Sequence, residues 1–178
     1  MAAAAGEERR KTACVTGGNG YIASLLIKML LEKGYVMKTT VRHPEDKEAN
    51  SHLEDLKKLG TLEVFRADLA EEGSYDAAVA GCDYAFLPAA PGTSPSKIPK
   101  KNLINFGVQG PFTFWRPGWK AGTGKRGVLT SSTAAASTRP LEGNGNWLNK
   151  NSFSNFKYFS AKRTGFWPYP GSKGFMKK

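Results

Sequence analysis

The pattern of apolar and polar residues is sharpest between residues 12 and 34. Residues 12–16 form a short, mostly apolar and β-branched run, which predicts a strand. Beyond Gly17-Gly18-Asn19-Gly20 the apolar residues recur at a period near 3.6, which predicts an amphipathic helix that ends at Gly34. The predicted apolar face of this helix consists of Ile22, Leu25, Leu26, Met29 and Leu30. The stretch is therefore a strand, a glycine-rich turn and a helix, in that order.

Similar patterns recur along the chain. They predict strands at residues 35–41, 62–66, 83–87 and 127–130. They also predict helices at residues 45–59 and 74–80, the second with Ser74 as its N-cap. The apolar face of the helix at 45–59 would consist of Ala49, His52, Leu53, Leu56 and Leu59. Strands and helices that alternate at these spacings predict an α/β fold with a doubly wound parallel sheet, in which the carboxyl ends of the strands share one edge and ligands bind there.

The glycine turn has the spacing G-x-x-G-x-x-A, with Gly17, Gly20 and Ala23 at its fixed positions. A helix that begins at such a turn directs free N–H groups and its positive dipole end at the glycines, which attracts a phosphate. The predicted dinucleotide-binding residues of this segment are Gly17, Gly20, Tyr21, Ile22 and Ala23. The alternative is a tight strand-to-helix turn that binds no ligand.

Two further segments follow predicted strands at the same edge. Arg42 stands after the second strand, 25 residues beyond Gly17, where the ribose next to adenine is read. An acidic residue there would repel a 2′-phosphate, whereas an arginine can pair with it, so NADP is predicted in preference to NAD. The alternative is a solvated arginine at a strand end. Asp68-Leu69 follows the third strand.

The formal net charge of +11 is unevenly distributed. Up to Ser96 there are 11 Lys and Arg against 14 Asp and Glu, and from Lys97 onward there are 15 against one. A basic, aromatic arm that binds nucleic acid is one explanation, but the positive charges follow no helix face or known motif, so no nucleic-acid partner is expected. The helix expected between residues 98 and 120 is also interrupted by prolines and glycines. Divergence of the second part from the pattern of its own fold explains both features better.

Cysteines and apolar segments limit the class of protein further. Cys14 and Cys82 are too few and too isolated for a disulfide framework or a metal site, so both are expected to be reduced and buried, and no metal is expected. No apolar stretch is long enough for a secretory signal or a membrane span, so a cytoplasmic protein is expected. The sequence does not determine the oligomeric state.

Candidate catalytic residues lie after the fifth predicted strand and near the end of the chain. Tyr169 and Lys173 are four residues apart, so on a helix they share one face and the ammonium group can lower the pKa of the phenol. Ser132, at the end of a strand, could donate a hydrogen bond to the same substrate oxygen. The three residues would form a proton-donating site for carbonyl-type reduction. Because Y-x-x-x-K also occurs by chance, this site depends on the glycine turn upstream.

With both features present, the chain resembles the extended short-chain dehydrogenase/reductase family. Within that family it is most similar to the plant dihydroflavonol reductase-like group, and above all to the anthocyanidin reductases. The resemblance covers about residues 10–175 and is dense to about residue 87. It rests on the segments TACVTGGNGYIASLLIKMLLEKGY, KTTVR, SHLEDLKKLGTLEVFRADL, AGCDYAF, VLTSSTAA, STRPLEGNG and AKRTGFWPYPGSK.

The resemblance implies a Rossmann-type fold that binds NADPH. It assigns the pyrophosphate turn to Gly17, Gly20 and Ala23, the 2′-phosphate contact to Arg42, and the neighbourhood of the adenine to Asp68-Leu69. It assigns the catalytic triad to Ser132, Tyr169 and Lys173, with Ser131 as the alternative serine and Lys173 also holding the nicotinamide ribose. The implied substrate is a small-molecule flavonoid, an anthocyanidin reduced to a 2,3-cis-flavan-3-ol in proanthocyanidin biosynthesis. The alternatives are a related dihydroflavonol or cinnamoyl-type carbonyl reductase and a non-catalytic dinucleotide-binding fragment.

The chain departs from the family at several places. Family members usually have a histidine-containing loop after the fourth strand, where this chain has Leu87-Pro88-Ala89-Ala90-Pro91. They also continue for about as long again beyond the position of Lys173, so the last sheet strands and the small substrate-binding domain are expected to be missing. The predicted domains are a flexible amino terminus at residues 1–10 and a truncated NAD(P)-binding Rossmann domain at residues 11–178.

Overall fold

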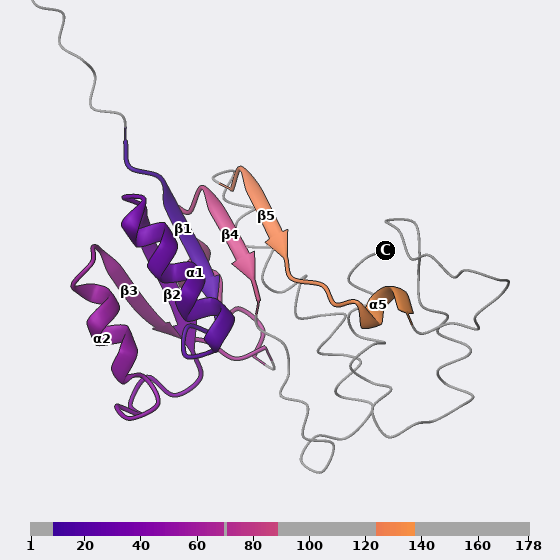
Figure 1. Cartoon of the computed structure of the whole chain (residues 1–178), viewed down its shortest axis with the longest axis horizontal. Helices are drawn as coiled ribbons and strands as arrows, with labels where there is room; N and C mark the ends of the chain where they lie inside the picture. The colour runs from indigo at the N-terminus through magenta and orange to yellow at the C-terminus, as the bar shows by residue number, and fades with distance from the viewer. Residues whose placement is uncertain (1–8, 70, 89–123, 138–178) are drawn as a thin grey trace, which may run out of the picture.

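The computed structural model of the chain describes residues 9–69, 71–88 and 124–137. These residues form a five-stranded parallel sheet (Figure 1). The strands are β1 (Thr12–Thr16), β2 (Val36–Val41), β3 (Leu62–Arg66), β4 (Tyr84–Leu87) and β5 (Arg126–Leu129). Their order is β3-β2-β1-β4-β5, so the chain first winds outward from β1 and then returns to its other side. This Rossmann-type, doubly wound parallel sheet confirms the predicted fold class.

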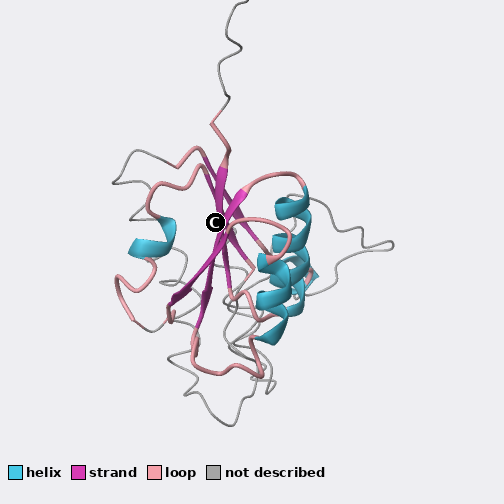
Figure 2. Ribbon diagram, turned by 90° about the vertical axis from the view of Figure 1, so that its left-hand side faces the viewer, coloured by secondary structure: helices cyan, strands magenta, loops and turns pink. Residues whose placement is uncertain are grey.

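Helices cover both faces of the sheet. The described helices are α1 (Tyr21–Glu32), α2 (Ser51–Lys57), α3 (Asp76–Val79) and α5 (Ala134–Ser137). Figure 2 shows the sheet edge-on, with the two longer helices side by side on one face and a short helix on the other. Right-handed crossovers produce this arrangement, because β1-α1-β2-α2-β3 and the return through α3 run in opposite directions across the sheet.

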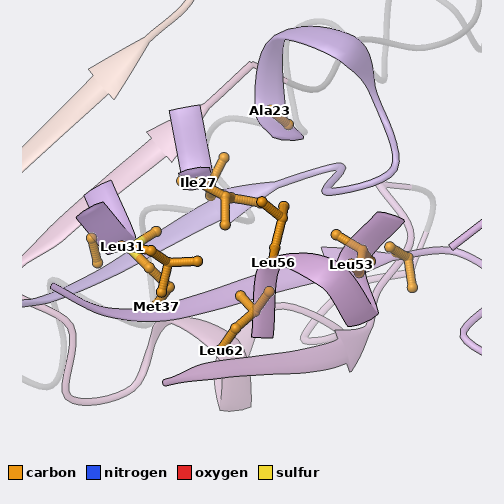
Figure 3. Packing of buried hydrophobic residues seen from close by; sticks show 10 residues of the cluster. Ala23, Ile27, Leu31, Met37, Leu53, Leu56 and Leu62 are labelled. Carbon is orange, nitrogen blue, oxygen red and sulfur yellow. The ribbon is translucent and has the colours of Figure 1, made fainter. Parts of the chain in front are cut away.

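Two apolar clusters fill the space between the sheet and these helices. The first joins α1 and α2 to one face and consists of Ala13, Val15, Ala23, Ile27, Leu31, Met37, Val41, Leu53, Leu56 and Leu62. Figure 3 shows the labelled side chains of this cluster gathered between the two helices and the sheet. The second lies on the other face and consists of Cys14, Ala67, Tyr75, Ala78, Val79, Cys82, Ala85 and Leu87. Neighbouring residues of β1 alternate between the two clusters, as the strand period of two requires.

The predicted apolar face of α1 is wrong in its details. The residues of α1 that the structure buries are Ala23, Ile27 and Leu31, at a spacing of four. Ile22, Leu25 and Met29 are 60%, 50% and 48% exposed. This helix is apolar around most of its circumference, so the sequence period does not decide which row faces the sheet.

The end of α1 was predicted correctly. Gly34 has φ +79°, a conformation that glycine adopts without strain. Its N–H donates to Leu31 O at 2.8 Å, and the N–H of Tyr35 donates to Leu30 O at 3.1 Å. This pair of hydrogen bonds is a Schellman motif, which satisfies the last carbonyl groups of the helix and directs the chain into β2.

The second and third helices are shorter than predicted. Residues 45–50 form turns, and α2 begins only at Ser51, because Asn50 and Asp46 direct their side chains to nearby backbone groups instead of continuing a helix. Of the predicted apolar face, Leu53 and Leu56 are buried and His52 is half-buried in α2, whereas Ala49 and Leu59 lie outside α2 and are exposed. Ser74 does not cap α3, because its hydroxyl donates to Asp68 O at 2.8 Å and the N-cap residue is Tyr75.

Asp83 ties the amino ends of three strands together. Its side chain is 2% exposed and accepts hydrogen bonds from Thr12 N at 2.9 Å and from the guanidinium of Arg9 at 2.8 Å. The ammonium of Lys125 lies 3.2 Å from the same carboxylate, at the start of β5. The Thr12 amide, more than the two basic groups, lowers the pKa of Asp83. The buried carboxylate therefore fixes the edge of the sheet opposite to the glycine turn.

Candidate cofactor-binding site

The glycine turn connects the carboxyl end of β1 to the first residue of α1. Gly17 has φ +69°, and its carbonyl accepts a hydrogen bond from Gly20 N at 2.8 Å, which closes the turn. A Cβ at position 20 would lie 3.2 Å from Gly17 O, closer than nearly all real Cβ contacts. Glycine at these positions therefore lets the backbone fold back tightly and leaves its outer side open.

The amino end of α1 has no side-chain cap among the residues that the structure describes. Gly20 is the N-cap residue and supplies no side-chain cap, and the first turn contains no acidic residue. The N–H groups of Tyr21, Ile22 and Ala23 have no acceptor within the helix, whereas Ser24 N donates to Gly20 O at 2.9 Å. Uncapped N–H groups and the helix dipole together fit a pyrophosphate.

Side-chain burial separates the three residues that follow Gly20. Tyr21 and Ile22 are 85% and 60% exposed, so the surface beside the start of α1 is open to solvent. Ala23 is 3% exposed and belongs to the same cluster as Val15 of β1, so a small residue here lets the helix lie close to the sheet. The roles in cofactor binding predicted for these residues stay predictions.

Strand β2 holds the turn from the side through two threonines that the sequence analysis did not identify. The Thr40 hydroxyl accepts a hydrogen bond from Gly17 N at 3.3 Å, and the Thr40 carbonyl accepts one from Gly18 N at 2.8 Å. The Thr39 hydroxyl donates to Val15 O at 2.7 Å. A Cβ at position 18 would lie only 2.3 Å from that hydroxyl. The Thr-Thr pair in the predicted strand was the available signal, but its use depends on the parallel register that places Thr39 beside Val15.

Helix α2 and its N-cap residue also contact this edge of the sheet, through two residues that the sequence analysis did not identify as part of the site. His52 is half-buried, and its Nε2 lies 3.2 Å from Gly18 O. Asn50 is 8% exposed, and its Nδ2 donates to His43 O at 2.7 Å. One of these contacts holds the glycine turn and the other holds the loop that follows β2.

Arg42 is the first residue after β2, as predicted. Its side chain is exposed and forms no ion pair with any residue that the structure describes. The neighbouring strand ends at the same edge, because Ala67 N donates to Val41 O at 3.0 Å. The guanidinium is therefore available to a phosphate at the carboxyl edge of the sheet.

Asp68 and Leu69 follow β3 at this edge and are half-buried. The Ser74 hydroxyl fixes the Asp68 backbone, accepting from its N–H at 3.2 Å and donating to its carbonyl. Leu69 packs against the second apolar cluster. Burial, followed by the charge of Asp68, raises the pKa of Tyr75 well above its usual value, so this phenol stays neutral beside the site.

The predicted catalytic residues are only partly within the described chain. Ser132 follows β5 and is half-buried, with its carbonyl accepting from Ala135 N at 2.9 Å, and Ser131 is exposed. Both serines thus lie beyond the carboxyl end of β5, as predicted. Tyr169 and Lys173 lie outside the described residues, so the triad stays a prediction.

The two cysteines are buried and free, as predicted. Burial raises the pKa of Cys82 to about 11 and that of Cys14 further, so neither thiol is reactive at neutral pH. Within residues 9–69, 71–88 and 124–137, no group of His, Cys, Asp and Glu could hold a metal ion. No described helix is long and apolar enough to cross a membrane.

Comparisons with known proteins agree with this geometry. The profile of the NAD(P)H-binding family matches residues 17–109. An anthocyanidin reductase ((2S)-flavan-3-ol-forming) of Vitis vinifera is 41% identical over 95% of this chain and 50% of its own length. A dihydroflavonol 4-reductase of Arabidopsis thaliana is 37% identical over 96% of this chain and 44% of its own. The crystal structure of vestitone reductase from alfalfa superposes with a TM-score of 0.77 at 30% identity, over 93% of this chain and 50% of that one. The chain thus spans about half the length of the relatives it matches.

Proposed function

The chain belongs to the NAD(P)H-binding family, and from this premise we propose that it forms the cofactor-binding part of an NADPH-dependent flavonoid reductase. The main support for the proposal is the start of α1 behind a glycine turn, together with the exposed guanidinium of Arg42 at the end of β2. Among the residues that the structure describes, no side chain caps this helix and none forms an ion pair with Arg42. The turn would hold the pyrophosphate, and Arg42 would hold the 2′-phosphate that distinguishes NADPH from NADH.

The family relatives support the reaction class. They include anthocyanidin reductases and a dihydroflavonol 4-reductase, which supports an anthocyanidin as the proposed substrate of this chain. NADPH, when bound, supplies hydride: reduction of an anthocyanidin cation to a flavan-3-ol would consume two hydrides and one proton, and therefore two NADPH in succession. Ser132 and Tyr169 would hydrogen-bond the substrate oxygen, Tyr169 would donate the proton, and Lys173 would lower the pKa of that phenol and bind the nicotinamide ribose. In the alternative reaction, reduction of a dihydroflavonol ketone, one NADPH would supply the hydride and Tyr169 would protonate the carbonyl oxygen.

The cofactor part of the proposal is tested by fluorescence titration with NADPH and NADH. The wild type should bind NADPH more tightly than NADH. Arg42→Glu replaces an attraction to the 2′-phosphate with a repulsion, so NADPH affinity should fall at least about 100-fold, whereas NADH affinity changes little. Lys33→Glu is the matched control, because it makes the same charge change at the far end of α1. Equal losses for both cofactors in Arg42→Glu would remove the assignment of NADPH.

The substrate part is tested by turnover of cyanidin with NADPH, followed by the loss of cofactor absorbance and by product analysis. Turnover of cyanidin to a flavan-3-ol supports the full proposal. Turnover of a dihydroflavonol but not of cyanidin would change the assigned substrate to a dihydroflavonol. Saturable cofactor binding without any turnover would mean that the chain binds a dinucleotide but does not catalyse this reduction. Retention on DNA that weakens with salt, without cofactor binding, would contradict the proposal altogether.

A further inference from the structure

The glycine turn and Arg42 lie on separate segments, and the start of α2 is linked to both. Asn50 reaches back to the loop that carries Arg42, and His52, two residues later, reaches the turn. We propose that Asn50 and His52 are positioning residues that fix the spacing between the pyrophosphate turn and Arg42, and that Asn50 thereby sets the preference for NADPH. The inference rests on the proposed function, because it concerns how that site is held.

Asn50 is the buried anchor of an otherwise exposed loop. Residues 42–49 are all exposed, whereas Asn50 is 8% exposed. Its Nδ2 donates to His43 O at 2.7 Å, and His43 is the residue next to Arg42. The backbone of Asn50 is itself held, because Leu53 N donates to Asn50 O at 2.9 Å at the start of α2. This hydrogen bond therefore fixes the backbone next to Arg42 relative to α2.

The oxygen atom of the Asn50 side chain supports the view that this residue is present for the hydrogen bond that its N–H group donates. Asn50 Oδ1 is buried and has no hydrogen-bond partner among the described residues. An unsatisfied buried acceptor is unfavourable, so an apolar side chain of the same size would serve packing alone at least as well. What an apolar side chain cannot supply is the donor to His43 O.

His52 links α2 to the glycine turn. A carbonyl oxygen only accepts hydrogen bonds, so Nε2 of His52 must carry the proton that it donates to Gly18 O at 3.2 Å. The N–H of Gly18 donates to Thr40 O at 2.8 Å. The turn is thus held by β2 on one side and by α2 on the other. Leu53 and Leu56 bury α2 against the sheet, so the helix is a fixed support for both ties.

The two ties predict different effects on the two cofactors. NADPH presents its pyrophosphate and its 2′-phosphate at a fixed separation, so it binds well only when the turn and Arg42 are correctly spaced. NADH has no 2′-phosphate and depends on the turn alone. Losing the Asn50 tie should therefore weaken NADPH selectively, whereas losing the His52 tie should weaken both cofactors alike.

The test is the ratio of dissociation constants for NADPH and NADH, measured by fluorescence titration of the full chain. Asn50→Leu should lower NADPH affinity by about tenfold and leave NADH affinity within about twofold, as expected for a residue that acts through a binding group. Ala49→Leu places the same side chain one residue earlier, without loss of a hydrogen bond, and should leave the ratio unchanged. His52→Leu should weaken both cofactors by a similar factor, and His52→Gln, which keeps an amide donor, should recover part of that loss.

Thermal unfolding of each variant shows whether it folds, and Asn50→Ala replaces Asn50→Leu if leucine does not fit. An unchanged affinity ratio in a folded Asn50 variant, while Arg42→Glu still changes it, would overturn this inference alone. The same ratio change in Ala49→Leu would also overturn it, because the effect would then not come from the amide. No effect of Arg42→Glu, or no NADPH binding by the wild type, would instead contradict the proposed function.

Discussion

The two sides of the sheet differ in how completely the described residues enclose them. In β1 and β2, eight of the eleven residues are buried, and helices pack on both faces. In β5, three of the four residues are exposed and the fourth is half-buried. Strand β5 joins the rest through its pairing with β4 and through Lys125 beside Asp83.

The two parts of the predicted site also differ in how far apart their residues lie in the sequence. The turn, Arg42 and the residues that hold them lie within about 40 residues of one another in consecutive β-α-β units, which bury their own apolar faces. The predicted triad instead combines Ser132 with Tyr169 and Lys173, which lie outside the described residues. Cofactor binding is therefore expected to depend on the first β-α-β units. Catalysis is expected to need the triad residues as well, which these units do not contain.

The largest effect that separates the two functions is expected for Tyr169→Phe. Removing the proton donor should lower flavonoid turnover by about 100-fold or more, because general acid catalysis contributes that much. NADPH affinity should stay within about twofold. Tyr158→Phe is the matched control, since it removes another phenol from the same part of the chain. Full turnover by Tyr169→Phe would remove this residue from the triad.

The next effect is expected within the cofactor-binding part, from Gly18→Ala. The new Cβ would meet the buried Thr39 hydroxyl at 2.3 Å, so the turn or β2 must shift. We expect a loss of about 1–3 kcal/mol in the free energy of unfolding and loss of NADPH binding. In the control, Gly60→Ala, the new Cβ meets only the end of the Leu31 side chain at 3.3 Å. Denaturant unfolding and NADPH titration of both variants decide, and unchanged binding in Gly18→Ala would contradict the described turn.

Asp83→Asn should separate stability from cofactor binding. The carboxylate joins the amino ends of β1, β4 and β5, at the edge opposite to the turn. Replacing it should cost about 1–3 kcal/mol of unfolding free energy, because Thr12 N, Arg9 and Lys125 lose a charged acceptor. NADPH affinity should be unchanged once the variant is folded. A selective loss of NADPH affinity without loss of stability would contradict this division.

A smaller effect is expected from pH. The Thr12 amide, then Lys125 and Arg9, hold the pKa of Asp83 below its usual value. A lowered pKa in the folded state gives stability that is fully present above the unfolded pKa, about 3.9, and is lost as the pH falls below it. The difference in unfolding free energy between wild type and Asp83→Asn should therefore be constant above about pH 4 and shrink as the pH falls further, through the lowered pKa. A difference that does not shrink below about pH 4 would mean that the carboxylate charge is not involved.

The sequence predicted the parts of the fold that depend on local pattern. The five strands lie within a residue or two of their predicted bounds, and Gly17, Gly34 and Arg42 stand where their residue types suggested. It failed where a choice depends on packing, as in α1, whose apolar residues surround most of the helix. The predicted helix at 45–59 shortened because Asn50 bonds to the backbone of the preceding loop.

The ties that hold the site were not predictable from local pattern. Thr40 and His52 contact the turn across 23 and 34 residues of sequence. Thr39 contacts Val15 of β1 across 24 residues, and Asp83 contacts Thr12 across 71. Each contact needs the register of β1 against its neighbours, which is a property of the assembled sheet. A threonine pair or a buried aspartate in the sequence carries no sign of its partner.

The most direct test of the account is the affinity of the wild-type chain for NADPH and NADH at the same ionic strength. We expect saturable binding of one equivalent of NADPH, tighter than that of NADH. Gly18→Ala should abolish this binding and Tyr169→Phe should leave it unchanged. Equal affinity for the two cofactors, or NADPH binding that survives Gly18→Ala, would contradict the assignment of the site to the glycine turn and Arg42.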